Sequence, residues 1–435
     1  MVKKNSAYTN STKQSNGFKT MFRSLQYRNY RLFFAGQSVS VIGTWIQQIA
    51  MPWLVYDLTK SVFLLGLVGF VGQVPTFILS PFAGVLTDRW NKYYILIATQ
   101  ILSMVQAIIL TFLVFTQSIE IWHIVLLSCF LGCINAFDTP ARQSFVIKMV
   151  DKKEDLGNAI ALNSSMVNAA RILGPSLAGV LIAATGEGIC FMINALSYVF
   201  VILSLLLMVI PHEKKIKSKP VLKEFKEGFS YTFSVIPIKY AILLLALVSL
   251  MGMSSIVLMP VFAKEILHGG SNTFGFLMAA SGLGALIGAF YLASRKSITG
   301  LDKVIPLSAA TFGIGLVMFS FFHVFILSLV LMVLMGLGMM LQMASCNTLI
   351  QTIVDDDMRG RVMSFFVMAF MGTAPFGSLL AGSAAKVIGV PHTILIGGIA
   401  CIVGALLFIR KLPEISKAIN LHTEKLTLAK MSMEA

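Results

Sequence analysis

Ionisable side chains are rare inside the long apolar stretches of this chain, and those that occur there are the candidates for chemistry. The segment Gly84-Val85-Leu86-Thr87-Asp88-Arg89-Trp90-Asn91-Lys92 places one carboxylate and two cations between two apolar runs. Asp138 and Arg171 lie within apolar runs. An arginine at the centre of a bilayer-spanning helix costs at least ~2.5–3.5 kcal/mol, so Arg171 is expected to face a polar cavity or a partner. Such groups suit proton or solute binding.

Asp138 and Arg171 leave two pairings open. Asp138 could pair with Arg171 on the following span, or with Arg142, which lies one helical turn away. Arg171 could instead contact a carboxylate or catecholate of a solute. A carboxylate whose protonation changes with access is what a proton-coupled carrier needs, and Asp138 is our candidate for that role.

The elements that must position these residues are membrane-spanning helices. The chain is 57% hydrophobic and only 12% charged, with a mean hydropathy of +0.83, which a soluble domain of 435 residues could not hide. An all-α membrane fold with twelve transmembrane helices is predicted. The expected spans are 32–56, 62–87, 93–115, 121–147, 157–184, 188–210, 237–264, 273–294, 302–322, 324–352, 361–387 and 391–410.

The net charge of +15 follows from topology and does not indicate a nucleic-acid partner. About 30 of the 34 Lys and Arg residues fall at span ends on the side of the N-terminus. Lys60, Lys264 and Lys386 are the exceptions at the opposite ends. Both termini are therefore predicted to be cytoplasmic. The first 29 residues are polar and basic and lack a small-residue cleavage site before the first long span, so no cleaved signal peptide is expected.

The chain divides into two similar halves. A tail and interfacial segment (1–29) precedes a six-helix bundle (30–210), a basic linker (211–236), a second six-helix bundle (237–411) and a polar cytoplasmic tail (412–435). Leu177-Ala178-Gly179 recurs as Leu380-Ala381-Gly382 at the matching place in the second half. Because six spans is an even number, the halves form a parallel repeat around a central cleft. Part of the linker has helical apolar spacing and is expected to lie on the inner leaflet.

The cleft is expected to be neutral and amphipathic with one cation nearby. Its predicted lining residues are Trp45, Gln47, Gln48, Asn135, Arg171, Gln342 and Asn347. Some of these would instead form hydrogen bonds between helices. The expected substrate is a bulky amphipathic or mildly anionic small molecule. The five cysteines lie in apolar spans, and neither they nor the methionines indicate a metal site or cofactor.

The chain resembles the major facilitator superfamily in three features. It has twelve predicted spans in two sets of six, a basic middle linker, and the motif Gly84-x-Leu86-x-Asp88-Arg89-x-x-Lys92. More narrowly, Gly43-Thr44-Trp45-Ile46-Gln47-Gln48 and Asp138-Thr139-Pro140-Ala141-Arg142-Gln143 resemble its enterobactin-exporter-like branch of drug:proton antiporters. This resemblance implies a proton-driven exporter, which we expect to be monomeric, in a bacterial inner membrane. It also implies a conformational latch at Gly84, Asp88, Arg89 and Lys92 that contacts the start of the eleventh span near residues 359–362.

The antiporter motif of the fifth span is only partly kept. Gly174, Pro175 and Gly179 match its helix-packing core, but other glycines are missing. Ser128 occupies the place where many drug antiporters carry an arginine. A lysophospholipid flippase of the same fold therefore remains an alternative. A non-transporting sensor or a membrane-embedded enzyme is disfavoured, because the sequence has no output domain, phosphate-binding loop or metalloprotease motif.

Overall fold

The computed structural model describes residues 22–146, 149–150, 152–209, 221–295, 300–355 and 357–434, and these residues contain helices and no strand. Side chains at 81, 84–85, 88–89, 153, 221–225 and 421–434 lie outside the description. Eleven helical segments in the described chain are long and apolar enough to cross a membrane. The remaining predicted span corresponds to the 32-residue helix α2. Polar residues such as Gln37, Gln47 and Gln48 make it less apolar than the others.

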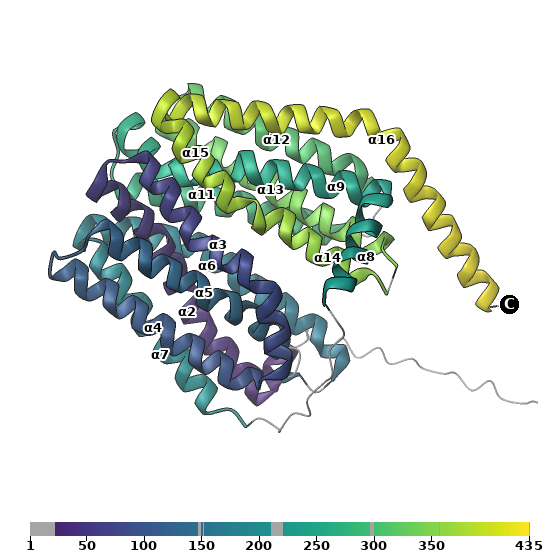
Figure 1. Ribbon diagram of the computed structural model, residues 1–435, viewed down its shortest axis with the longest axis horizontal. Coiled ribbons are helices and arrows are strands. Elements are labelled where there is room, and N and C mark those ends of the chain that lie inside the picture. The colour runs from purple at the N-terminus through teal and green to yellow at the C-terminus, as the bar shows by residue number, and fades with distance from the viewer. Residues whose placement is uncertain are drawn as a thin grey trace, which may run out of the picture.

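The N-terminal half contains six long helices (Figure 1). After the short 3₁₀ helix η1 (Arg23–Gln26) they are α2 (Arg28–Thr59), α3 (Val62–Arg89), α4 (Lys92–Phe115), α5 (Ile121–Val146), α6 (Lys153–Thr185) and α7 (Glu187–Leu206). The segment before α2 is fixed to the start of α6. The guanidinium of Arg23 contacts Asp155 at 2.8 Å, and the hydroxyl of Tyr27 donates to Asp155 at 2.7 Å.

The C-terminal half begins with a linker helix and a composite seventh span. The linker helix is α8 (Val221–Ser234), and the span runs through α9 (Ile236–Leu247), the π-helix η3 (Val248–Gly252), the 3₁₀ helix η4 (Met253–Leu258), α10 (Met259–Val261) and the π-helix η5 (Phe262–Ile266). Such irregular backbone is tolerated at membrane depth where protein or a cavity surrounds it.

Five further spans complete this half. They are α11 (Ser271–Ser294), α12 (Leu301–Phe321), α13 (Phe325–Ile353), the composite α14 (Arg359–Val367), η6 (Met368–Gly372) and α15 (Ala374–Ile388), and α16 (Val390–Glu434). The predicted polar tail 412–435 continues α16 as a helix as far as Glu434. Ser416 on this extension donates a hydrogen bond to Asp302 at the start of α12, so the extension is partly packed against the bundle.

The linker helix α8 packs against protein. Its Phe229 ring lies 5.9 Å from the Phe365 ring of α14, and Arg361 pairs with Glu227 at 2.8 Å. The hydroxyl of Tyr231 donates to Asp355 at 2.9 Å. The linker helix α8 is therefore anchored to the start of the eleventh span, while Phe229 remains half exposed.

The two halves meet through small residues of α3, α15, α6 and α11. A Cβ added to Gly66 would lie 2.9 Å from the Cα of Gly382, and one added to Gly275 would lie 2.9 Å from the Cα of Gly179. Gly179 and Gly382 are the repeated glycines of the two Leu-Ala-Gly motifs, and each meets a glycine of the other half. Small residues at such places let helix backbones approach closely. The internal repeat therefore marks the interface between the halves.

These interface glycines predict a contrast between two valine substitutions. A side chain at Gly284, which faces Val333 of α13 within the C-terminal half, would lie 1.9 Å from a backbone oxygen. Gly284→Val is expected to overpack the bundle and cost about 1–3 kcal/mol of stability or more. Gly66→Val acts between halves that can move apart as bodies, so a smaller loss is expected. Thermal unfolding of the purified variants tests this; an equal loss from both would contradict it.

Candidate functional site

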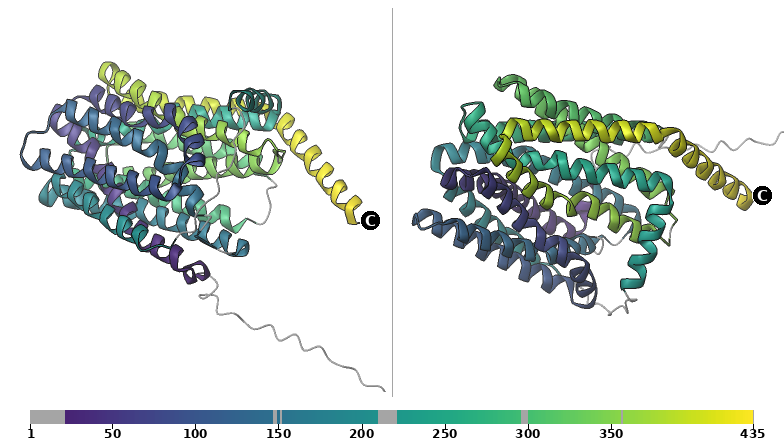
Figure 2. Two further views of the ribbon diagram at one scale, coloured as in Figure 1. Left: turned by 60° about the horizontal axis from the view of Figure 1, so that its bottom comes forward. Right: turned by 45° about the horizontal axis from the view of Figure 1, so that its top comes forward.

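A cavity of about 520 Å³ lies between the two halves. Its described wall is formed by α2, α3, α4, α5, α6 and α7 from the N-terminal half and by η4, α11, α13 and α15 from the other. Figure 1 and Figure 2 show the halves converging near the α2–α3 turn and diverging towards α8 and the start of α14. We call these the closed end and the open end. A volume of this size suits a small organic molecule.

The structure places most, but not all, of the predicted cavity residues on this wall. Trp45, Gln47, Gln48, Asn135 and Arg171 line the cavity. Gln342 and Asn347 do not: the side chain of Gln342 is buried and donates to the carbonyl of Leu244, and the amide oxygen of Asn347 accepts from Gln351 at 2.9 Å. Both residues lie on α13, where apolar residues are not confined to one face, so the sequence did not indicate which face turns inward.

Gln47 belongs to a hydrogen-bonded network as well as to the cavity wall. Its amide donates to Gln106 at 3.2 Å and accepts from Asn194 at 2.7 Å. These contacts join α2, α4 and α7. Paired amides of this kind stabilise helix packing where water is absent. Gln47 is therefore held in place, whereas Gln48 and Asn135 present exposed amides to the cavity.

Arg171 is the cation of the cavity. Its guanidinium lies over the indole ring of Trp45, 5.4 Å from the ring centroid, an arrangement that stabilises a cation through the ring quadrupole. Gly174 helps to place this pair, because a Cβ there would lie 2.4 Å from the Cβ of Trp45. Pro175 also lines the cavity, and Gly179 packs against Gly275 of the other half. The predicted packing motif thus lies between the cavity and the interface.

Asp138 is buried within the N-terminal half and is absent from the cavity wall. Its carboxylate accepts from Thr99 at 2.9 Å and from Gln100 at 2.8 Å, and lies 3.4 Å from the guanidinium of Arg142. Of the two pairings that the sequence left open, the structure shows the one with Arg142. Asp138 therefore links α4 to α5 and leaves Arg171 to the cavity.

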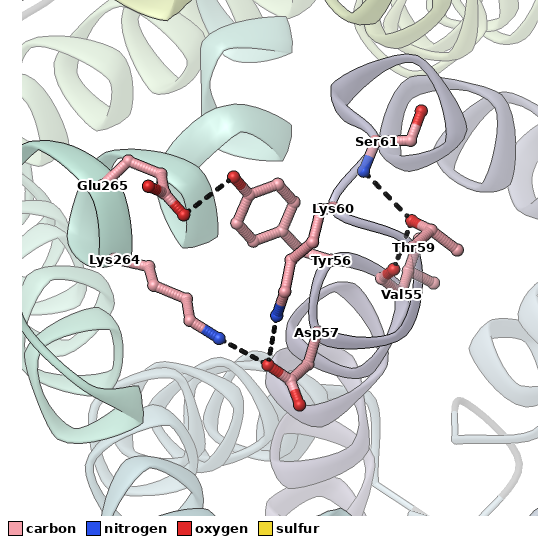
Figure 3. Close-up of polar contacts among 8 residues, drawn as sticks. All are labelled: Val55, Tyr56, Asp57, Thr59, Lys60, Ser61, Lys264 and Glu265. Carbon is pink, nitrogen blue, oxygen red and sulfur yellow. Dashed lines mark hydrogen bonds and ion pairs between the residues drawn. The ribbon is translucent and has the colours of Figure 1, made fainter.

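At the closed end, polar side chains of the two halves interlock (Figure 3). Lys264 of η5 forms an ion pair with Asp57 of α2, and Lys60 contacts the same carboxylate at 2.8 Å from within α2. The hydroxyl of Tyr56 donates to Glu265 at 3.1 Å. Two neighbouring residues of each half thus bond to two neighbouring residues of the other.

Aromatic side chains lie close to this polar layer. The Trp53 ring stacks on the Phe274 ring of α11 at 6.1 Å, and the ammonium of Lys264 lies 5.5 Å from the Trp53 ring centroid. On the other side of the interface, Lys386 of α15 lies over the Phe63 ring of α3. Phe274 lines the cavity. Phe274 therefore belongs both to the cavity wall and to the aromatic contacts of the closed end.

Sequence reasoning missed this closed-end cluster. The one sequence feature that points to this cluster is the presence of three lysines, Lys60, Lys264 and Lys386, at the span ends that carry few basic residues. Asp57 and Lys264 are too far apart in sequence for any local spacing rule to pair them.

The predicted latch is described only in part. The side chains of Asp88 and Arg89 lie outside the described residues, and of Gly84 the structure describes only its place in the backbone of α3. The backbone there ends α3 at Arg89, and Asn91 caps α4 by accepting from the amide of Tyr93 at 3.0 Å. Lys92 begins α4.

Comparisons with known proteins agree with this architecture. The family model for transmembrane secretion effectors matches residues 19–433. The staphyloferrin A transporter of Staphylococcus aureus is 28% identical over 87% of this chain and 95% of its own length. Macrolide efflux protein A of Streptococcus pyogenes is 24% identical over 87% and 96%. The enterobactin exporter EntS of Shigella boydii is 24% identical over 87% and 91%.

Solved structures share the fold. A bacterial homologue of the iron transporter ferroportin, in an inward-facing state, has a TM-score of 0.67 at 17% identity and covers 88% of this chain and 98% of its own. A bacterial homologue of the human lysosomal transporter Spinster has a TM-score of 0.64 at 14% identity, over 92% and 98%. Two helix bundles around a central cavity and a family match over nearly the whole chain lead to one conclusion. The chain belongs to the transmembrane secretion effectors of the major facilitator superfamily and has the fold of a membrane transporter.

Proposed function

We propose that the protein exports a small amphipathic or mildly anionic solute, such as a siderophore or a drug, in exchange for protons. The observation that carries this proposal is a solute-sized cavity between two bundles that are bonded to each other at one end. Such a carrier works by alternating access, in which the bundles rock around a fixed site. The names of the relatives support efflux of siderophores and macrolides as the class of activity.

The distribution of basic residues gives the proposed orientation. The open end carries the linker helix α8, and most Lys and Arg residues of the sequence fall on this side of the spans. It is therefore proposed to face the cytoplasm of a bacterial inner membrane. The closed end then faces outward, and the described arrangement accepts solute from inside. We propose that this monomeric carrier has both termini in the cytoplasm.

Proton coupling is proposed to involve a group outside the cavity wall. The described lining residues include no aspartate, glutamate or histidine. Asp138 is the proposed proton carrier, and its pairing with Arg142 and Gln100 must loosen when it is protonated. Protonation of Asp138 would then allow α4 to move against α5, which would change the conformation of the N-terminal bundle.

The closed-end ion pair predicts coupled effects of two substitutions. Asp57→Ala and Lys264→Ala are each expected to lower the population of the closed arrangement a few-fold, because partly exposed ion pairs contribute about 0.2–1 kcal/mol. In a double-mutant cycle the second change should add little to the first. Distances between spin labels at Ser118 and Val324, on opposite halves, report this population.

Lys60→Ala is the matched control for that cycle. Lys60 contacts the same carboxylate but lies on the same helix as Asp57, so its loss should leave the closure of the two halves nearly unchanged. Additive effects of Asp57→Ala and Lys264→Ala, or a Lys60→Ala effect as large as theirs, would refute a gate made by the cross-half pair.

Proton release on solute binding tests the coupling proposal. Purified protein in weakly buffered detergent solution should release protons when candidate siderophores or lipophilic drugs are added. Asp138→Asn keeps one oxygen as an acceptor for Thr99 and Gln100, and should bind solute without releasing protons. Solute binding by the wild-type protein without proton release would exclude antiport through Asp138. It would favour facilitated transport or lipid flipping.

The latch proposal predicts a transport defect without a folding defect. Asp88→Asn removes the charge that we propose docks on the positive N-terminal end of α14 when the open end closes. Transport into proteoliposomes should fall several-fold while the amount of folded protein is unchanged. Glu120→Gln, a carboxylate change in the turn at the opposite end, serves as the control. Wild-type transport rates in Asp88→Asn would refute the latch.

A further inference from the structure

The cavity wall is divided by chemistry between the two halves. The exposed amides of Gln48, Gln73 and Asn135 and the guanidinium of Arg171 all come from the N-terminal half. The C-terminal half contributes only serines as polar side chains among the described lining residues. It contributes five of the six lining methionines, namely Met253, Met278, Met339, Met340 and Met343. The amides and the cation of the described wall therefore lie on one half, among apolar neighbours, and the facing half is apolar except for its serines.

Arg171 has an incomplete set of contacts. An arginine stays charged and offers five N–H donors. Among the described residues, the one aromatic, ionic or hydrogen-bonding contact of this guanidinium is with the face of Trp45. No carboxylate lines the described cavity wall, and Asp138 on the neighbouring helix is paired with Arg142. A cation at membrane depth is costly unless an anion or polar group meets it. Planar anions such as carboxylates fit a guanidinium fork well.

The methionines have the properties of an adaptable apolar surface. Their side chains are unbranched, flexible and polarizable, so they can follow the shape of different apolar groups. Met339, Met340 and Met343 come from one stretch of α13, and Met253 and Met278 come from η4 and α11. Three separate elements thus bring methionines to the same cavity. A wall of this kind favours ligands with an apolar part and tolerates apolar parts of different shapes.

We propose that the cavity binds an amphipathic anion in a fixed orientation. Its acid group lies on Arg171, beside Gln48 and Asn135, and its apolar part lies on the methionines of the opposite half. This inference deepens the proposed export function and rests on it. The ligand bridges the two bundles, so its binding free energy depends on their relative position. The acid group is recognised strictly, and the apolar part is recognised loosely.

Three probes that share a decanoyl amide chain and differ in their terminal group test this orientation. They are N-decanoylglycine, its neutral carboxamide N-decanoylglycinamide, and the cationic N-(2-aminoethyl)decanamide. Calorimetric titration of the full-length protein in nanodiscs, with empty nanodiscs as the blank, gives the three affinities. The acid should bind at least about tenfold more tightly than the carboxamide, since hydrogen bonds to charged groups are the stronger ones. The cation should bind most weakly.

Variants of each wall separate the two contributions. Arg171→Gln should reduce acid binding to the level of the carboxamide and leave the carboxamide nearly unchanged. Arg31→Gln, which alters an exposed arginine of α2 outside the cavity, should keep the preference for the acid. Met339→Ser with Met343→Ser should weaken the acid and the carboxamide by the same factor.

Equal affinities for the acid and the carboxamide in the wild-type protein would overturn the proposal. So would a loss in Arg171→Gln that is equal for the acid and the carboxamide, because that is the result of a structural role. The titrations need no transport. If the protein prefers the acid but moves no solute across a vesicle membrane, that result would refute the export function and leave the binding proposal intact. Equal transport of acid and carboxamide would retract the anion preference alone.

Discussion

Close packing of small residues between the two bundles is the constraint on which the rest of the structure depends. Gly66 meets Gly382 on one side of the interface and Gly179 meets Gly275 on the other. Backbones that approach this closely leave little room for side chains there, so the bundles are held together near one end. The cavity, the Trp53–Phe274 pair and the Asp57–Lys264 ion pair all lie along this interface. The aromatic pair and the ion pair each join residues of both halves, so separating the halves would break these contacts without unpacking either bundle.

For the halves to move against each other at that interface, each bundle must hold together by itself. Within the N-terminal half, buried polar side chains join helices to one another through Gln47, Gln106 and Asn194, and through Asp138 with Thr99 and Gln100. In the C-terminal half the seventh span departs from α-helical geometry at η3 and η4, and η4 lines the cavity. The first feature favours motion of the half as one body, and the second places irregular backbone where a solute would bind.

The sequence predicted much of the fold, because in a membrane each helix must be long and apolar. The internal repeat of Leu-Ala-Gly was visible, and the structure gives its physical reason in the glycine contacts of Gly179 and Gly382. The helical end of α16 was not expected. Its polar composition indicates a tail, and its contact with Asp302 depends on tertiary packing.

The candidate site was less predictable. Trp45 and Arg171 could be proposed because a cation and an indole stand out in an apolar span. Gln342 could not be placed correctly, because α13 is apolar on all sides and gives no periodic signal for its inner face. The five cavity methionines of the C-terminal half come from three elements, and Asp57 and Lys264 come from opposite halves. Only the folded structure brings these residues together.

Alternating access of the two halves is the central claim, and paired distance measurements test it most directly. Spin labels at Ser118 and Val324 report the closed end, and labels at Lys152 and Asp357 report the open end. When a bound solute or a change of pH shifts the protein, the account predicts that one distance distribution lengthens while the other shortens. Active transport by a protein whose two distances stay constant, or change in the same direction, would contradict it.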